Sequence, residues 1–140
     1  MAAAGYETFE HGADIGIRGW GHSLEQAFAQ AALAMFSLIR PDLEGLSPKD
    51  GIFIQAEGYD LESLFVAWLN SLLSQADIQD LIFCSFEPRI QGFRLEAWAY
   101  GQKQTQDPEL QGVEVKGATF SELQVCEQQG LWLAQCVVDV

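Results

Sequence analysis

The residues best suited to chemistry lie near the two ends of the chain. Residues 9–18, FEHGADIGIR, place a histidine and two carboxylates beside glycines, and residues 137–140, VVDV, close an apolar run with an aspartate. A carboxylate held in a glycine-containing bend has two common uses, because it either accepts hydrogen bonds from nearby N–H groups or binds a cation. Both ends of the chain therefore offer candidate ligand groups.

Asp14 and Asp139 are the candidate cation ligands. Hard cations such as calcium and magnesium take carboxylate, carbonyl and water oxygens. The termini of compact domains often meet, so the first and last strands could lie side by side and share one ion between these aspartates and a backbone carbonyl. The alternative stays open, since Asp14 could cap a turn and Asp139 could be a solvated strand end.

His11 and Lys116 are two further candidates, each with more than one interpretation. His11 could be a ligand, a base or a hydrogen-bonded structural imidazole, and the lack of a second histidine or a cysteine at ligand spacing favours the structural role. Lys116 is one of only seven basic residues. It could pair with Asp14 or Asp139, meet a partner's carboxylate or phosphate, or protect a sheet edge as an outward-facing lysine.

Composition limits the function classes. At 140 residues, 49% apolar and 19% charged, residues 1–140 are predicted to form a single globular domain. Twenty acidic and seven basic residues give a net charge of −13, which disfavours stable nucleic-acid binding and suits a basic protein partner or a divalent cation. Three cysteines without CxxC spacing are typical of buried thiols in a reducing cytosol.

No apolar stretch is as long as a membrane span, and the first residues lack the features of a signal peptide, so we expect a cytoplasmic protein with no membrane partner. The four tryptophans lie in apolar patterns and are expected in the core.

Apolar periodicity and turn residues predict strands alternating with two helices before a run of further strands. The expected elements are an extended segment 5–21, a helix from Ser23 to Pro41, a strand 51–57, a helix from Asp60 to about 75–77, a hairpin 82–90 and 93–102, a polar loop 104–112, and strands at about 113–127 and 131–140. This order predicts an α+β fold, with two helices packed on a mainly antiparallel sheet in a single two-layer domain.

Taken together, these segments resemble the archease family over nearly the whole chain. The likeness rests on residues 9–18, SLEQAF at 23–28, GYDLESL at 58–64 with WLN at 68–70, EVKGATF at 114–120 and VDV at 138–140. The order of these motifs is more specific than any one of them alone.

Archeases are small cofactors of RtcB-type RNA ligases, which join RNA ends. The resemblance implies a non-enzymatic protein that promotes guanylylation of the ligase and restores it for further turnovers in tRNA splicing or RNA repair. It also implies a divalent cation, calcium in the family with magnesium or manganese as alternatives, on Asp14, Asp139 and Val140. Lys116 matches a further functional position, and His11 joins it as a candidate for partner contact.

The chain departs from the family pattern at two positions. Gly12 stands where a threonine is usual, and Phe120 stands where a tyrosine is usual, so a hydroxyl and a phenol are missing near the site. Two other functions remain open. One is a chaperone or specificity modulator of a tRNA-modifying enzyme such as a methyltransferase. The other is a metal-dependent phosphoesterase, which one acidic pair without a histidine cluster supports poorly.

Overall fold

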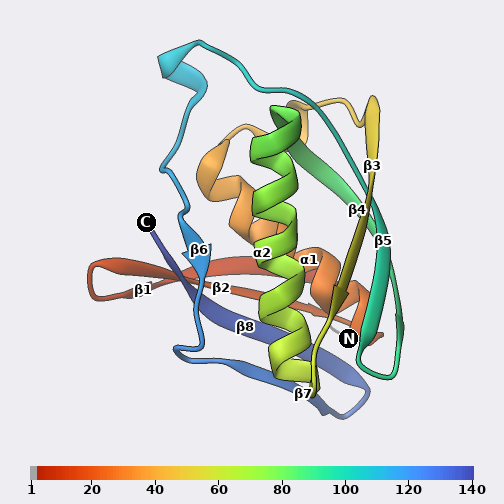
Figure 1. Cartoon of the computed structure of the whole chain (residues 1–140). Helices are drawn as coiled ribbons and strands as arrows, with labels where there is room; N and C mark the ends of the chain where they lie inside the picture. The colour runs from red at the N-terminus through yellow and green to blue at the C-terminus, as the bar shows by residue number, and fades with distance from the viewer. Residues whose placement is uncertain (1–2) are drawn as a thin grey trace.

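The structure is a computed structural model that describes residues 3–140. Within these residues it contains two α-helices, eight strands and two short 3-10 turns (Figure 1). In chain order they are β1 (Gly5–His11), β2 (Asp14–Gly21), α1 (Leu24–Ile39), η1 (Leu43–Gly45), β3 (Asp50–Glu57), α2 (Leu61–Gln79), β4 (Leu81–Gln91), β5 (Arg94–Lys103), η2 (Pro108–Leu110), β6 (Gly117–Ala118), β7 (Gln124–Gln128) and β8 (Leu131–Asp139).

The strands form two antiparallel sheets with the helices packed against both. The first sheet has the order β1-β2-β8-β6, and β7 also pairs with β8; the second has the order β3-β5-β4. Helix α1 contacts β1, β2 and β8 on one side and β4 on the other, while α2 contacts β3, β4 and β5 as well as β6 and β7 (Figure 1). The α+β class is confirmed, although the strands divide into two sheets where one was expected.

Helix α1 begins and ends at the residues that the sequence predicts. The Ser23 hydroxyl accepts a hydrogen bond from the Gln26 amide at 3.1 Å, which satisfies one of the free N–H groups of the first turn. The helix ends at Ile39, and Pro41 follows two residues later because proline offers no N–H to continue the helix.

Helix α2 supplies the largest buried side chain of the core. Asp60 and Ser63 form a capping box at its first turn, as each side chain bonds the other's backbone N–H. Trp68 is fully buried, and its indole N–H donates to the Phe28 carbonyl of α1 at 3.0 Å. No helix within residues 3–140 has both the length and the apolar character needed to cross a membrane.

Two boundaries differ from those expected. Helix α2 continues to Gln79 because no residue breaks it before Asp80, which takes a left-handed conformation with φ of 56°. The strand expected at 113–127 is divided: β6 pairs with the end of β8, β7 pairs with its beginning, and the chain between them turns at Glu122 with φ of 52°.

The expectation that all four tryptophans lie in the core is wrong for Trp98. Its side chain is 47% exposed on the outer face of the second sheet, where it lies beside Phe53 with ring centroids 5.5 Å apart. Both helices cover only the inner face of that sheet, so the outward residues of β3 and β5 remain accessible. Of the cysteines, Cys136 is buried, and this burial raises the pKa of its thiol to about 12.

Close packing of β2 on α1 yields a stability prediction. A Cβ on Gly19 would lie 2.6 Å from the Ala27 carbonyl oxygen and closer still to the Ala31 amide, so Gly19→Ala should force strand and helix apart. We expect a loss of about 1–3 kcal/mol in the free energy of unfolding. Urea denaturation measures it, with Gly45→Ala as the control because a Cβ there meets nothing within 4 Å. Equal stability of the two variants would contradict this packing.

Candidate functional site

The candidate residues form a row across the first sheet. His11 of β1 pairs with Asp14 of β2, and Ile15 pairs with Val138 of β8. One step further along the same register, Asp14 faces Asp139, which in turn pairs with Gly117 of β6. Residues directly opposite each other in antiparallel strands project from the same face. The register therefore brings the first and last motifs of the chain together.

A direct hydrogen bond links the two chain ends. The Val140 amide donates to Oδ1 of Asp14 at 3.3 Å, across 126 positions of sequence. The Asp14 side chain is half-buried and the Asp139 side chain is exposed, so the pair lies at the surface where an ion or a partner can reach it. Figure 1 shows the turn between β1 and β2 and the C-terminal end of β8 on the same side of the molecule.

The segment that carries Lys116, directly before β6, lies on the other side of Asp139 from Asp14. The Lys116 amide donates to the Asp139 carbonyl at 2.8 Å, which fixes the backbone of this segment beside β8. The Lys116 side chain is exposed and forms no ion pair within residues 3–140, so it meets neither Asp14 nor Asp139. Its backbone shapes the site, and its ammonium group faces solvent.

His11 lies in this row of residues, but its side chain contacts Glu122, which is not part of the row. Its Nε2 atom lies 3.6 Å from a carboxylate oxygen of Glu122, in the turn between β6 and β7. Both side chains are roughly half exposed, at 43% and 54%. A charged pair of this exposure contributes little to stability, typically below about 1 kcal/mol. The contact nevertheless orients the imidazole toward the β6–β7 turn.

The donor set around Asp14 fits a hard cation. Asp14 and Asp139 offer carboxylate oxygens and Val140 offers a backbone oxygen, which are the ligand types that calcium prefers. No group of three or more histidine, cysteine, aspartate or glutamate side chains in the described part of the chain is placed to hold a metal ion. Water or a partner would have to complete the shell, because calcium takes six to eight oxygens.

Gly12, which stands where the family usually has a threonine, has a conformational role. Gly12 is the first of the two residues that join His11 to Asp14, and its φ is +61°. Glycine at the first central position with positive φ is typical of a type II′ hairpin turn. The turn that places Asp14 is thus built on a residue without a Cβ. Phe120, the second departure, is 61% exposed beside β6.

Sequence reasoning assigned no role to Asn70, although it lies in the matched motif of α2. Its side-chain oxygen accepts from the Ala118 amide at 2.9 Å, and its side-chain nitrogen donates to the Ala118 carbonyl at 3.4 Å. The amide thus pairs with β6 as a neighbouring strand would. An exposed polar residue on an otherwise apolar helix face was the available signal.

Asn70→Ala should release β6 from α2. Loss of two hydrogen bonds at an exposed position costs about 1 kcal/mol, and we expect faster hydrogen exchange at the Ala118 amide with the core amides unchanged. Native-state exchange followed by NMR measures this. Ser74→Ala, one turn along α2, is the control. Unchanged protection at Ala118 would show that the Asn70 amide does not hold the strand.

Comparisons with known proteins identify related sequences. The model of the Archease protein family (MTH1598/TM1083) matches residues 6–140. The protein archease of Pyrococcus abyssi is 39% identical over 140 residues, covering 96% of this chain and 98% of its own length. The protein archease of the fish Ictalurus punctatus is 35% identical over 129 residues, covering 89% of this chain and 78% of its own length.

Solved structures share the fold. The solution structure of Methanobacterium thermoautotrophicum protein 1598 superimposes with a TM-score of 0.83 at 29% identity, covering 97% of this chain and 99% of that one. The crystal structure of an archease from Thermotoga maritima, described as a possible chaperone, gives a TM-score of 0.62 at 17% identity, with 96% of each chain covered, and supports the fold alone. On its sequence and its structure together, this chain belongs to the archease family.

Proposed function

We propose that the chain is a non-enzymatic activator of an RtcB-type RNA ligase, acting in the cytoplasm in tRNA splicing or RNA repair. It promotes guanylylation of the ligase and so sustains repeated turnover. Family membership supports this function, and the observation that carries it is the juxtaposition of Asp14 with the end of β8, where the Val140 amide bonds the Asp14 carboxylate. Two motifs from opposite ends of the sequence meet at one exposed anionic point.

Opposite charges guide the encounter between the anionic site at Asp14 and Asp139 and the ligase. A ligase active site must hold RNA phosphates and GTP, so it carries positive charge. The chain has a net charge of −13, and complementary potentials accelerate encounter between proteins in a salt-dependent way. Asp14 begins β2 and Asp139 ends β8, so both lie at one end of the sheet, where a pocket of opposite charge can approach them.

Asp14, Asp139 and the Val140 backbone would hold the divalent cation that the family implies. When bound, calcium or a similar ion offsets the negative charge that develops on a transferred phosphate. The chain itself holds the ligand groups in fixed positions, because the paired strands β2 and β8 place the two carboxylates on a rigid sheet. Lys116 and His11 flank the carboxylates as contacts to the partner.

A second candidate function is a chaperone or modulator of a tRNA-modifying enzyme. The exposed aromatic residues Phe53 and Trp98 on the second sheet favour contact with another protein that does not use the carboxylates. Capture of the partner on the immobilised chain distinguishes the two, since a methyltransferase rather than a ligase would support this alternative. A third function, phosphoesterase activity, would require turnover of phosphoesters without any ligase.

Removing one carboxylate should strongly reduce ligase activation. We expect Asp14→Asn and Asp139→Asn to reduce stimulation of ligase–GMP formation about 10- to 100-fold, the range seen when a group supporting a metal site is lost. Labelled GTP and the purified ligase measure the adduct. Glu127→Gln, an exposed carboxylate of β7, is the charge-matched control and should stimulate as the parent chain does. Full stimulation by both aspartate variants would refute the proposal.

Cation binding should also stabilise the isolated chain. A ligand at about 100 times its Kd adds about 2.7 kcal/mol to the free energy of unfolding, so calcium should raise Tm by several degrees and EDTA should reverse the change. Asp14→Asn should remove this increase while Glu127→Gln keeps it. An equal calcium-dependent shift in both variants would place the ion elsewhere on the chain.

A further inference from the structure

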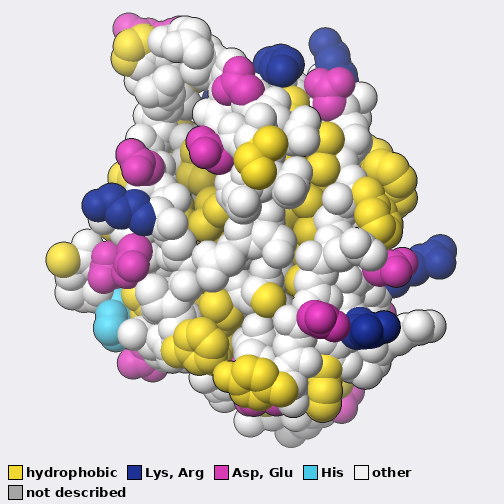
Figure 2. All heavy atoms as spheres, viewed as in Figure 1, with side chains coloured by type: hydrophobic (Ala, Val, Ile, Leu, Met, Phe, Trp, Pro, Cys, Tyr) yellow, Lys and Arg dark blue, Asp and Glu magenta, His cyan; other side chains and the backbone are white. Residues whose placement is uncertain are grey.

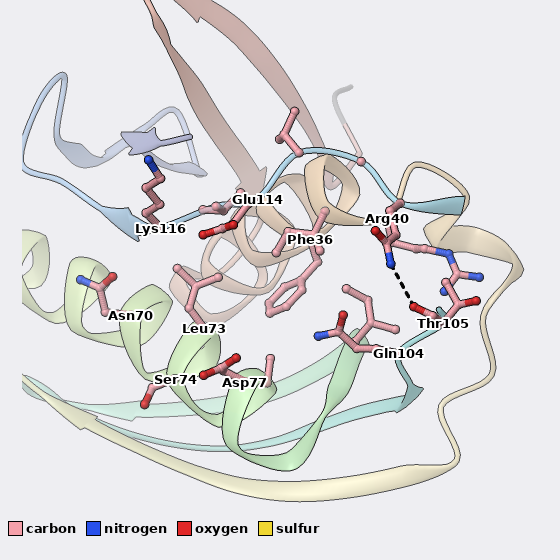
Figure 3. A pocket seen from close by; sticks show the side chains of 17 residues that line it. Phe36, Arg40, Asn70, Leu73, Ser74, Asp77, Gln104, Thr105, Glu114 and Lys116 are labelled. Carbon is pink, nitrogen blue, oxygen red and sulfur yellow. Dashed lines mark hydrogen bonds between the residues drawn. The ribbon is translucent and has the colours of Figure 1, made fainter. Parts of the chain in front are cut away.

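A groove outside the carboxylate row has no assigned role. It has a volume of about 710 Å³ and lies between α2 and residues 104–116, a connection that we call the strap (Figure 3). Its floor is apolar, formed by Phe36, Ile39, Leu73 and Ile82. Figure 2 shows hydrophobic side chains at the bottom of a hollow beside α2. A volume of this size is within the range of ligand-binding pockets, and the apolar floor can bury apolar groups of a bound segment.

The groove lies at the C-terminal ends of both helices. Ile39 ends α1, and Asp77 lies in the last turn of α2; both line the groove. The C-terminus of a helix carries partial negative charge from its free carbonyl groups. Neither helix has a basic residue in its last turn, but the strap amides of Gly112 and Val113 donate to the last carbonyls of α1, and Lys103 donates to the Gln79 carbonyl of α2. The helix ends are therefore largely satisfied, and a preference for a cationic group must come from the side chains of the groove.

Two carboxylates supply negative potential from opposite walls of the groove. Asp77 projects from α2 and Glu114 from the strap, on either side of the apolar floor (Figure 3). Neither forms an ion pair within residues 3–140.

The basic residues that line the groove do not neutralise these carboxylates. Arg40 bonds Asp42, and its side chain is only 8% exposed. The Lys116 side chain extends away from the groove floor (Figure 3). A cation supplied from outside would thus meet two carboxylates with no competing partner.

We propose that this groove binds an arginine side chain presented by an extended, apolar segment of a partner protein. A guanidinium group is weakly hydrated and hydrogen-bonds carboxylates through a rigid fork of donors, which suits a site with an apolar floor and two carboxylate walls. The amides of Glu114 and Val115 donate no hydrogen bond to another group within residues 3–140. The strap can therefore offer a backbone donor to an extended peptide, which favours a peptide over a free small cation. Identification of the partner as the ligase rests on the proposed function.

A matched pair of peptides tests the groove without the ligase. Ac-Leu-Arg-Leu-NH₂ at millimolar concentration should shift the NMR resonances of Leu73, Asp77, Glu114 and Val115 in the full chain. The same peptide with citrulline in place of arginine keeps the shape and removes the charge, and it should bind at least fivefold more weakly. Shifts centred elsewhere, or equal binding of both peptides, would overturn the inference.

Variants of the groove test whether its two carboxylates bind the arginine peptide. The double variant Asp77→Asn/Glu114→Gln should weaken the arginine peptide about fivefold, as expected for two exposed ion pairs. Asp50→Asn/Glu127→Gln removes the same charge from exposed positions that do not line the groove and should bind as the parent chain does. Unchanged peptide affinity in the groove variant would also overturn the inference.

The ligase assay separates this inference from the proposed function. The groove variant should raise the chain concentration needed for half-maximal guanylylation severalfold and leave the plateau unchanged, whereas Asp14→Asn should lower the plateau. A chain that binds the arginine peptide in the groove but stimulates no ligase would contradict the proposed function alone. An unchanged half-maximal concentration in the groove variant would show that the ligase does not use the groove.

Discussion

The pairing of β2 with β8 is the constraint on which the site depends. Seven residue pairs run from Ile15–Val138 to Gly21–Trp132, and this register alone decides that Asp14 and Asp139 meet. A slip of one residue would turn one of the carboxylates to the opposite face. The register is fixed because one face of β2 packs directly on α1, where Gly19 leaves no room between strand and helix. Helix packing therefore sets the position of a site whose ligand groups all lie on strands or at the end of the chain.

Helix α2 has a comparable role on the other side of β8. Its Asn70 amide pairs with Ala118, and the short strand β6 then holds the backbone of Lys116 against Asp139. The same helix contributes Leu73 and Asp77 to the groove below the strap. The carboxylate row and the groove are thus built on one rigid support, so a partner that contacts both meets two surfaces with a fixed relative position.

Local sequence patterns predicted the helices and most strands because their signals are local. Ser23, Asp60 and Pro41 mark helix boundaries through hydrogen bonds or missing donors within one turn. The sequence left open whether Asp14 and Asp139 meet, because that depends on long-range strand pairing. The separation into two sheets, the exposure of Trp98 and the role of Asn70 depend on which elements cover one another, and residue spacing carries no such information. Residues 104–112, most of the strap, have no apolar periodicity, so the groove beneath the strap could not be predicted.

The central claim is that the two ends of the sequence form one anionic site for a cation. Paramagnetic broadening by Mn²⁺ tests this most directly, because the effect falls steeply with distance from the ion and reports its position in the folded chain. At substoichiometric Mn²⁺, the amide resonances of Asp14, Asp139 and Val140 should broaden first, followed by Lys116. Broadening that begins at Asp77 and Glu114 in the groove, or that spreads evenly over the acidic surface, would contradict the account.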